Sequence, residues 1–312
     1  MNSSITRERM LASIAAVVAF GLPTRLLATS KIIRIGAIAS DVSAQPHYAQ
    51  AQGFYRRAGL DAQVSTFPNG GAIIAGVASG ALDVGFGNLT SIAAARQRGL
   101  PVRLVSAATL YLKRSPVTVL VRARGAKLQS GADLRGKTIA VSTLKGELQV
   151  GASAWIDKTG GDSTQAKFLE LPFSAMSAAL GAGRIDAAML TEPLITQNKD
   201  TVEILSDAYT AIADEFLIGG FIASENWIHD NPDATRQFAL AMHDTARWAN
   251  THRDDTAVIL ARESKLDEKL VRAMTRATYG ERLEAEMIQP VLDCAFKYGS
   301  LKAAMTAKEL LA

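Results

Sequence analysis

Residues 73–90 read IIAGVASGALDVGFGNLT and carry the pattern that decides the fold. The first half is small and apolar, lacks proline and ends at Gly80, which predicts a short buried helix closed by a glycine that tolerates positive φ. Residues 82–87 form a brief apolar run between turn residues, as expected of a strand buried on both faces. Asn88 or Thr90 can then cap a second helix. The stretch therefore predicts a helix, a strand, a glycine-rich turn and a new helix.

The same pattern returns later in the chain, where residues 175–192 read AMSAALGAGRIDAAMLTE. Gly183 and Asp186 take the places of Gly80 and Asp83. A repeated unit of this kind suggests two similar α/β lobes whose strand ends could face each other. We therefore expect the functional site to lie between two lobes.

Strands and helices alternate on both sides of these two units. Apolar runs predict strands at residues 31–39, 60–67, 102–107 and 117–122, and again at 138–141, 168–171, 185–190 and 201–205. This alternation predicts parallel sheets with helices on both faces. Residues 216–224 predict a return crossing, and the amphipathic helices from Asn231 onward are expected to pack on the first lobe. The predicted division is 31–123 for the first part of lobe 1, 124–222 for lobe 2 and 223–312 for the helical return to lobe 1.

Residues 1–30 have the features of an export signal. Arg7 and Arg9 precede an apolar stretch at 10–22 that falls short of the about 20 residues needed to span a bilayer. We expect cleavage near Ser30 and a periplasmic mature protein. A membrane-anchoring N-terminal helix is the alternative.

The composition limits the classes of partner. The chain has 34 Lys and Arg against 30 Asp and Glu, with a net charge of +4 and mixed signs along its length. No basic tract with interleaved aromatic residues occurs, which argues against a nucleic-acid partner. Cys294 is the only cysteine, so no internal disulfide can form, and the four histidines lack metal-ligand spacing. We expect a monomer with no cofactor and no metal.

The turns after the predicted strands form the candidate site. In parallel sheets such turns collect at one edge beside helix N-termini, whose free N–H groups suit an anion. Each helix end contributes only about 0.3–1 kcal/mol to an exposed anion, so several must converge with a cation to hold one. The candidate ligand-binding residues in these turns are Ser40, Asp41, Gln45, Asn69, Gly70, Asn88, Thr90, Thr109, Tyr111, Ser142, Thr143, Lys145, Phe173, Thr191 and Glu192.

Several of these candidates have two interpretations. Lys145 is the candidate cation, or else a solvated lysine in a surface turn. Ser142 and Thr143 can reach a ligand, but they can equally cap the following helix. Asn69, Asn88 and Thr90 carry the same ambiguity, as turn or capping residues.

Glu192 and two aromatic residues have the same ambiguity. Glu192 before Pro193 is either a first-turn acid favoured by the helix dipole or a residue that faces the cleft. In the cleft it would repel a pure anion and favour an amine or amide donor. Tyr111 and Phe173 can stack on a planar solute or belong to ordinary packing.

The mature chain resembles the periplasmic solute-binding proteins for nitrate, sulfonates, taurine and pyrimidine precursors that serve ABC importers. The resemblance rests on the ordered series IGAIA (35–39), AQGFYRRAGLDAQV (51–64), NGGA (69–72), ASGALDVGFG (78–87), RGLPVRLVSA (98–107), ADLRGKTIAV (132–141), GRIDAAMLTEP (183–193) and FIASENWIHDNPDA (221–234). It implies a type II binding-protein fold, with two α/β lobes joined by two crossovers. Such a protein closes on one small solute and delivers it to a membrane permease with a separate ATPase. Residues 142–146 depart from the family pattern, so a family ligand cannot be carried over.

Patterns typical of enzymes are incomplete. Ser142 and Lys145 match S-x-x-K, but the S-D-N and K-T-G partners are missing. Thr90 stands where a dinucleotide fingerprint beginning at Gly85 needs its third glycine. The pyrimidine-precursor synthases that share the fold are known for a cysteine cluster, which Cys294 alone cannot supply. We predict a receptor for a small organic solute. The predicted solute is an anion such as a sulfonate or carboxylate, with or without an aromatic ring. The alternative is an enzyme that uses the same cleft, such as a pyrimidine-precursor synthase-like protein.

Overall fold

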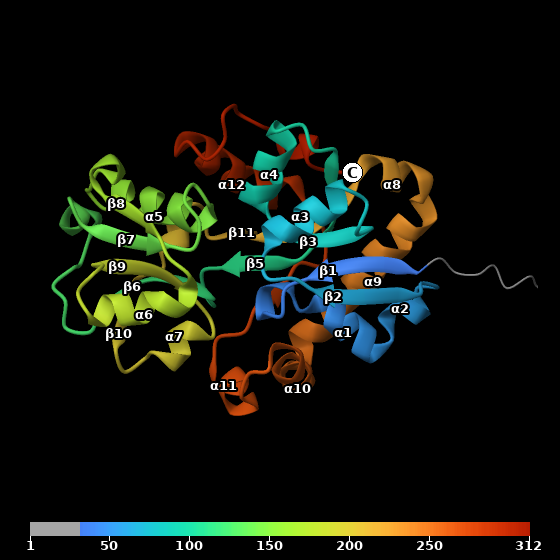
Figure 1. Cartoon of the computed structure of the whole chain (residues 1–312), viewed down its shortest axis with the longest axis horizontal. Helices are drawn as coiled ribbons and strands as arrows, with labels where there is room; N and C mark the ends of the chain where they lie inside the picture. The colour runs from blue at the N-terminus through green and yellow to red at the C-terminus, as the bar shows by residue number, and fades with distance from the viewer. Residues whose placement is uncertain (1–31) are drawn as a thin grey trace, which may run out of the picture. The chain divides into compact units, whose positions relative to one another are not determined.

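Two five-stranded sheets form the framework of the computed structural model, which describes residues 32–312 (Figure 1). The first has the order β2 (Ala62–Thr66), β1 (Ile33–Ala37), β3 (Val84–Asn88), β12 (Gly219–Ser224) and β4 (Val102–Ala107). The second has the order β10 (Val202–Ser206), β6 (Thr118–Ala123), β9 (Ala187–Thr191), β7 (Thr138–Val141) and β8 (Lys167–Glu170). We call these sheets and the helices packed on them lobe 1 and lobe 2.

A smaller sheet lies along the crossings between the lobes. It consists of β11 (Glu215–Leu217), β5 (Thr109–Leu112) and β13 (Thr278–Tyr279). The chain leaves lobe 1 through β5 and returns through β11, which confirms the two crossovers. The predicted signal peptide, residues 1–30, falls outside the described residues. Among residues 32–312, none of the helices combines the length and the apolarity needed to cross a membrane.

The repeated unit predicts its own local structure correctly. Helix α3 (Gly70–Ala78) precedes β3, and α6 (Phe173–Gly181) precedes β9. Gly80 and Gly183 follow these helices with φ of 76° and 64°. Both glycines therefore adopt the left-handed conformation that ends a helix at low cost.

The aspartates of the repeat have the same role in each lobe. The carboxylate of Asp83 accepts the Arg34 backbone N–H at 2.8 Å, and that of Asp186 accepts the Thr138 N–H at 2.8 Å. A cation supports each bond, since Arg34 also donates through its side chain and Lys137 lies 3.0 Å from Asp186. The same aspartate contact thus aligns β1 with β3 in lobe 1 and β7 with β9 in lobe 2.

Two strands differ from the prediction of purely parallel sheets. β12 is antiparallel to both β3 and β4, and β6 is antiparallel to both β9 and β10. The prediction placed residues 117–122 in lobe 1 and the return boundary at 222, whereas β6 pairs in the second sheet and β12 begins in the first at Gly219. A Cβ at Gly219 would lie 2.7 Å from the Gly87 carbonyl oxygen, so the glycine allows this close pairing.

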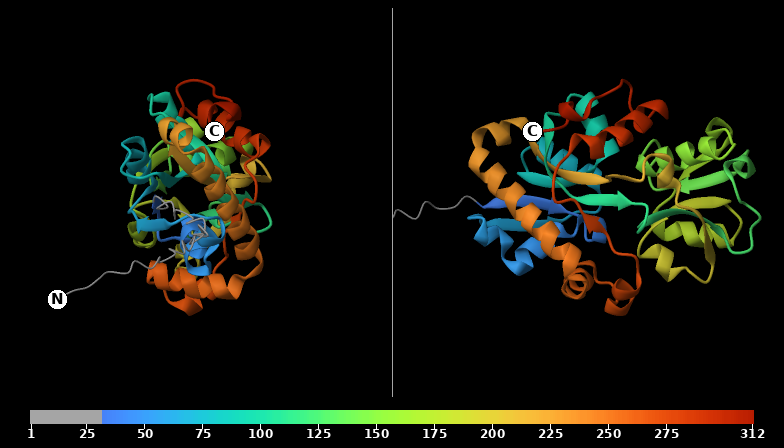
Figure 2. Two further views of the ribbon diagram at one scale, coloured as in Figure 1. Left: turned by 90° about the vertical axis from the view of Figure 1, so that its right-hand side faces the viewer. Right: turned by 180° about the vertical axis from the view of Figure 1, so that it is seen from behind.

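Helices cover both faces of the first sheet. The helices of lobe 1 are α1 (Gln45–Gln52), α2 (Phe54–Arg57), α3, α4 (Leu89–Gln97), α8 (Glu225–Asp230), α9 (Pro232–Thr251), α10 (Arg253–Ser264), α11 (Glu268–Ala273) and α12 (Ala285–Lys297). Figure 2 shows α9 running across the back of this sheet, where it contacts β4 and α1. Gly53, at φ 73°, separates α1 from α2. Among the apolar residues of this helical part of the chain, Leu260 and Met274 are buried, whereas Phe296 is 45% exposed.

Helices cover both faces of the second sheet as well. Helix α5 (Glu147–Lys158) covers one face, and α6 covers the other, with the short α7 (Leu194–Gln197) following β9 (Figure 1). Leu120 of β6 belongs to the core under α5, while Val119 and Val121 belong to the core under α6. This alternation explains why the strand is apolar from Val119 to Val121. The remaining short 3₁₀ helices are η1 (Asp41–Ser43), η2 (Gly131–Leu134), η3 (Ser163–Gln165), η4 (Ala208–Ala211) and η5 (Ala307–Glu309).

Candidate functional site

The carboxyl ends of the parallel strands meet at one edge in each lobe. In lobe 1, Ile35 of β1 pairs with Val84 of β3 in parallel register, so the turns at 40–45 and 88–90 share an edge. In lobe 2, Ala140 of β7 pairs with Ala188 of β9 in the same way. The turns at 142–146 and 191–193 therefore share the corresponding edge.

Two contacts join these edges. The Glu192 carboxylate, at the end of β9, accepts the Thr275 N–H at 3.2 Å, and residue 277 of the same segment is bonded to Asp41 of lobe 1. On another side, α5 of lobe 2 contacts α4 of lobe 1, and the Thr90 N–H near the start of α4 approaches Glu147 at the start of α5. The strand-end turns of the two lobes therefore face one another, and we call the boundary between them the seam.

Two candidates act as helix caps. The Asn69 side chain accepts the Ala72 N–H at 2.9 Å, and the Asn88 side chain accepts the Ser91 N–H at 2.8 Å. Asn88, and not Thr90, is therefore the N-cap of α4. Capping uses the side-chain oxygen of each asparagine and leaves its NH₂ group available to donate a hydrogen bond.

Asp41 is held in a buried ion pair. Both of its carboxylate oxygens accept from the Arg276 guanidinium at 3.0 Å, and the Ala277 N–H donates at 2.6 Å. The hydroxyls of Tyr48 and Tyr279 complete the cluster. The side chains of Asp41 and Arg276 are 5% and 9% exposed. Asp41 therefore fixes the turn after β1, and its carboxylate is already saturated with donors.

Four further candidates make internal bonds. Thr109 donates to the Val42 carbonyl at 2.6 Å, and Thr191 donates to the Val117 carbonyl at 2.9 Å. Tyr111 donates to Asp207. Besides Thr275, the Glu192 carboxylate accepts the hydroxyl and N–H of Thr196, so these contacts stabilise the crossings and the start of α7.

The remaining exposed candidates line the turns. Ser40, Gly70, Ser142 and Phe173 are partly exposed, and Thr143 and Lys145 are exposed. Lys145 adopts φ 57°, in the left-handed region that disfavours a side chain with a Cβ. Its role as a cation for the ligand stays a prediction.

We expect Lys145→Gly to stabilise the protein by up to about 1 kcal/mol, because glycine removes the strain of a positive φ. Urea unfolding measures the change, and Lys265→Gly, at φ 58° after α10, is the matched control. A gain at Lys265 together with a loss at Lys145 would show that the Lys145 side chain contributes to stability.

Gln45 and Thr90 are buried without hydrogen-bond partners for their side chains. They are 0% and 2% exposed, and the Gln45 amide and the Thr90 hydroxyl find no partner anywhere in residues 32–312. Native proteins satisfy the large majority of such groups, so each exception needs an explanation.

Glu147 is a third buried group of this kind, and the sequence did not single it out. It is the first residue of α5, is 4% exposed, and neither carboxyl oxygen is hydrogen-bonded within the described part of the chain. Burial raises the pKa of Glu147 to about 8. The Thr90 N–H and the Tyr209 hydroxyl are close enough to oppose this shift in part, although neither completes a hydrogen bond to the carboxyl group.

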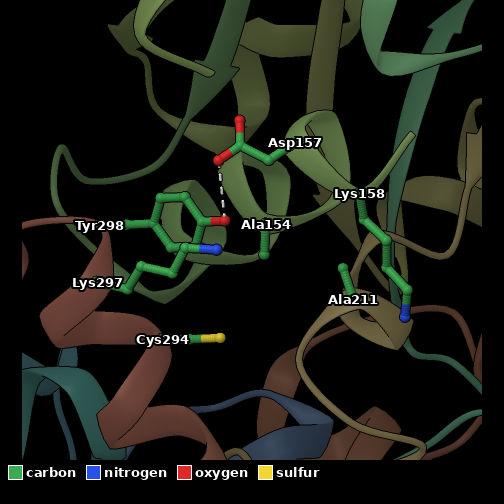
Figure 3. Close-up of a pocket in the computed structure, with 7 residues that line it drawn as sticks. All are labelled: Ala154, Asp157, Lys158, Ala211, Cys294, Lys297 and Tyr298. Atoms are coloured by element: carbon green, nitrogen blue, oxygen red, sulfur yellow. Dashed lines mark hydrogen bonds between the residues drawn. The ribbon is translucent and has the colours of Figure 1, made fainter. Parts of the chain in front are cut away.

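Two cavities lie away from these residues. One, of about 310 Å³, lies between α5 and α12, where the Tyr298 hydroxyl donates to Asp157 at 3.1 Å and Cys294 faces the same space (Figure 3). The other, of about 760 Å³, lies between α2 and α9 beside Trp248. Neither is lined by a predicted site residue. No group of three or more metal-ligating side chains gathers within residues 32–312.

Two α/β lobes with facing strand ends, two crossovers and a helical return to lobe 1 define the type II periplasmic binding-protein fold. The chain belongs to the NMT1/THI5-like family, whose model matches residues 43–256. A protein of Brucella abortus (strain 2308) named as a binding protein is 24% identical over 277 residues, covering 85% of this chain and 81% of that protein. The riboflavin-binding protein RibY of Chloroflexus aurantiacus is 27% identical over 215 residues, covering 63% and 56%.

Solved structures share the fold at low identity. The periplasmic aliphatic sulphonate binding protein SsuA from Escherichia coli superposes with a TM-score of 0.75 at 15% identity, covering 91% of this chain and 92% of that one. The desulfurization enzyme DszB superposes with a TM-score of 0.64 at 14% identity, covering 90% and 96%. The fold therefore serves binding proteins and an enzyme, and the residues of the seam must distinguish between the two.

Proposed function

We propose that this protein is an extracytoplasmic solute-binding receptor of an ABC importer. Its two lobes close on a small organic solute, and the closed form delivers the solute to a membrane permease driven by a separate ATPase. The observation that carries this proposal is the seam itself. Both lobes direct their strand-end turns into it, and three buried polar side chains there have no partner among the described residues: Gln45, Thr90 and Glu147.

Thr90 and Glu147 are buried at the seam in this structure, so a solute reaches them when the lobes separate. Thr90 and Glu147 come from different lobes and are 2% and 4% exposed. Separation exposes both side chains, and closure around a solute returns them to a buried site with new partners. The similarity to the Brucella binding protein and to SsuA supports this opening and closing of the lobes.

An enzyme in the same seam is the second candidate, because DszB shares the fold. Cys294, the only cysteine of the chain, lies on α12 at the cavity beside α5 and away from the strand-end turns. An enzyme would therefore have to work without a thiol at the seam. A receptor explains the polar side chains at the seam as hydrogen-bonding groups for a solute and requires no reactive group.

We expect the solute to raise the melting temperature and to be recovered chemically unchanged. A ligand that binds only the folded state at 100 times its Kd adds about 2.7 kcal/mol to the free energy of unfolding. Mass spectrometry of the solute that copurifies with the native protein identifies it, and a melting-shift series over sulfonates, carboxylates, amino acids and pyrimidines tests it. Chemical conversion of the solute during incubation would contradict the receptor proposal and support the enzyme alternative.

A further inference from the structure

We propose that Glu147 accepts a hydrogen bond from an N–H group of the bound solute. The solute is then a compound with an N–H donor, either an ammonium or a heterocyclic N–H, and not a bare sulfonate or carboxylate. This inference rests on the proposed function, since it names the chemistry of the solute that the seam takes up.

Glu147 and Gln45 occupy equivalent positions in the two lobes. Gln45 is the first residue of α1, which follows β1, and Glu147 is the first residue of α5, which follows β7. Both side chains are more than nine-tenths buried, and none of their polar atoms has a partner within residues 32–312. Leaving one buried polar group unpaired weakens a fold, and two at matched positions indicate a role outside folding.

The surroundings of Glu147 come from both sides of the seam. Thr90 of lobe 1 approaches the carboxyl group with its backbone N–H, and the Tyr209 hydroxyl approaches from η4. The Tyr209 ring packs over Gly151, where an added Cβ would lie 2.4 Å from the ring. The phenol therefore lies along α5, with its hydroxyl toward Glu147.

The charges at the seam favour a donor over an acid. Arg276 is paired with Asp41, and Lys145 is exposed, so neither cation is enclosed and free beside Glu147. An acid group of the solute bound beside Glu147 would bury its own negative charge without a compensating cation. An N–H donor supplies the hydrogen bond that both carboxyl oxygens lack within the described residues.

Matched pairs of probes test this inference. Taurine is compared with isethionate, uracil with 1,3-dimethyluracil, and riboflavin with 3-methylriboflavin, so that the members of a pair differ in the N–H group. Binding is measured by melting shift and calorimetry for the wild type, Glu147→Leu and Glu147→Gln. Glu284→Gln, which changes an exposed acid before α12, is the control.

We expect only the N–H member of a pair to bind and its affinity to fall about 10- to 100-fold in Glu147→Leu, but not in Glu284→Gln. Equal binding of both members, or an unchanged affinity in Glu147→Leu, overturns the inference and leaves the receptor in place. If none of these probes binds, the solute released from the native protein is tested against Glu147→Leu. A released solute without an N–H group also overturns the inference.

The two sources of the N–H group differ in proton exchange. An ammonium binds the ionised carboxylate, so its binding near neutral pH releases a proton, and calorimetric enthalpies in two buffers differ. A heterocyclic N–H binds without that release, and the enthalpies agree. Glu147→Gln weakens the ammonium strongly and the heterocycle little, because only the ammonium needs the negative charge. Chemical conversion of a probe refutes the receptor independently of these results.

Discussion

Arg276→Met is expected to destabilise the protein by about 3–5 kcal/mol, because it leaves the Asp41 carboxylate buried without its cation. Two bonds at 3.0 Å join the guanidinium to Asp41, and both side chains are more than nine-tenths buried. The loss is large beside the 5–15 kcal/mol that typically separates folded from unfolded states. Urea unfolding of the purified variant measures it.

The double variant Asp41→Asn/Arg276→Met separates the charge from the packing. Removing both charges leaves no unpaired ion, so the double variant should recover much of the stability that Arg276→Met loses. Arg236→Met, on the exposed face of α9, is the control and should change stability little. A double variant no more stable than Arg276→Met would assign the loss to packing around the guanidinium.

The same ion pair also positions the site. Asp41 begins the turn that ends at Gln45, and the Tyr279 hydroxyl donates to the Asp41 carbonyl at 2.6 Å. Arg276 belongs to the segment whose Thr275 N–H binds Glu192 of lobe 2. We therefore expect Arg276→Met to weaken solute binding as well, although Arg276 itself is committed to Asp41.

The local signals of the repeat were enough to predict its unit. Gly80 and Gly183 adopt positive φ, and Asn88 caps α4, because a helix end needs these residue types wherever the rest of the chain lies. The direction of β12 has no such local signal. Its apolar run fits a parallel or an antiparallel neighbour equally well, and the point at which the chain re-enters lobe 1 decides between them.

The site residues were predictable only in part. The strand-end turns could be placed from the strand pattern, but Asp41 and Arg276 are 235 positions apart and no spacing connects them. Glu147 has an ordinary local signal, an acid at a helix start. Its burial depends on Thr90 and Tyr209, which other parts of the chain bring to it. Aligning the two lobes on their first helices would have placed it opposite Gln45.

Glu147→Gln is expected to stabilise the solute-free protein by about 3 kcal/mol at pH 7 and to have no such effect at pH 4. The pKa of Glu147 rises from 4.5 in an exposed chain to about 8 in the folded protein, chiefly through burial. Below 4.5 both states hold the proton, and the carboxyl group costs the fold no ionisation energy. Between the two values the unfolded chain ionises while the folded protein keeps its proton. The wild type therefore loses about 1.4 kcal/mol per pH unit relative to the variant, and the difference levels off above about pH 8.

Two neighbouring ionisable groups do not reverse this sign. Burial raises the pKa of Tyr209 well above its usual value, so its hydroxyl stays neutral throughout the window. Burial also raises the pKa of Asp207, which accepts from Tyr111, and its titration affects the wild type and the variant alike. The difference between the two proteins therefore isolates Glu147. Urea unfolding between pH 4 and pH 9 measures it, with Glu284→Gln as a control whose difference from the wild type stays flat.

The height of the plateau carries information about the seam. If the lobes separate at low cost, the wild type opens above pH 8 and exposes the ionised Glu147 to water. The difference in unfolding free energy between Glu147→Gln and the wild type then cannot exceed the free energy of opening. Small-angle scattering then shows the wild type expanding between pH 6 and pH 9, while Glu147→Gln keeps its dimensions. If the seam stays shut, the full difference develops and neither protein expands. Stability curves that run parallel from pH 4 to pH 9 would contradict a buried, proton-holding Glu147, and with it the role of this side chain as the acceptor at the seam.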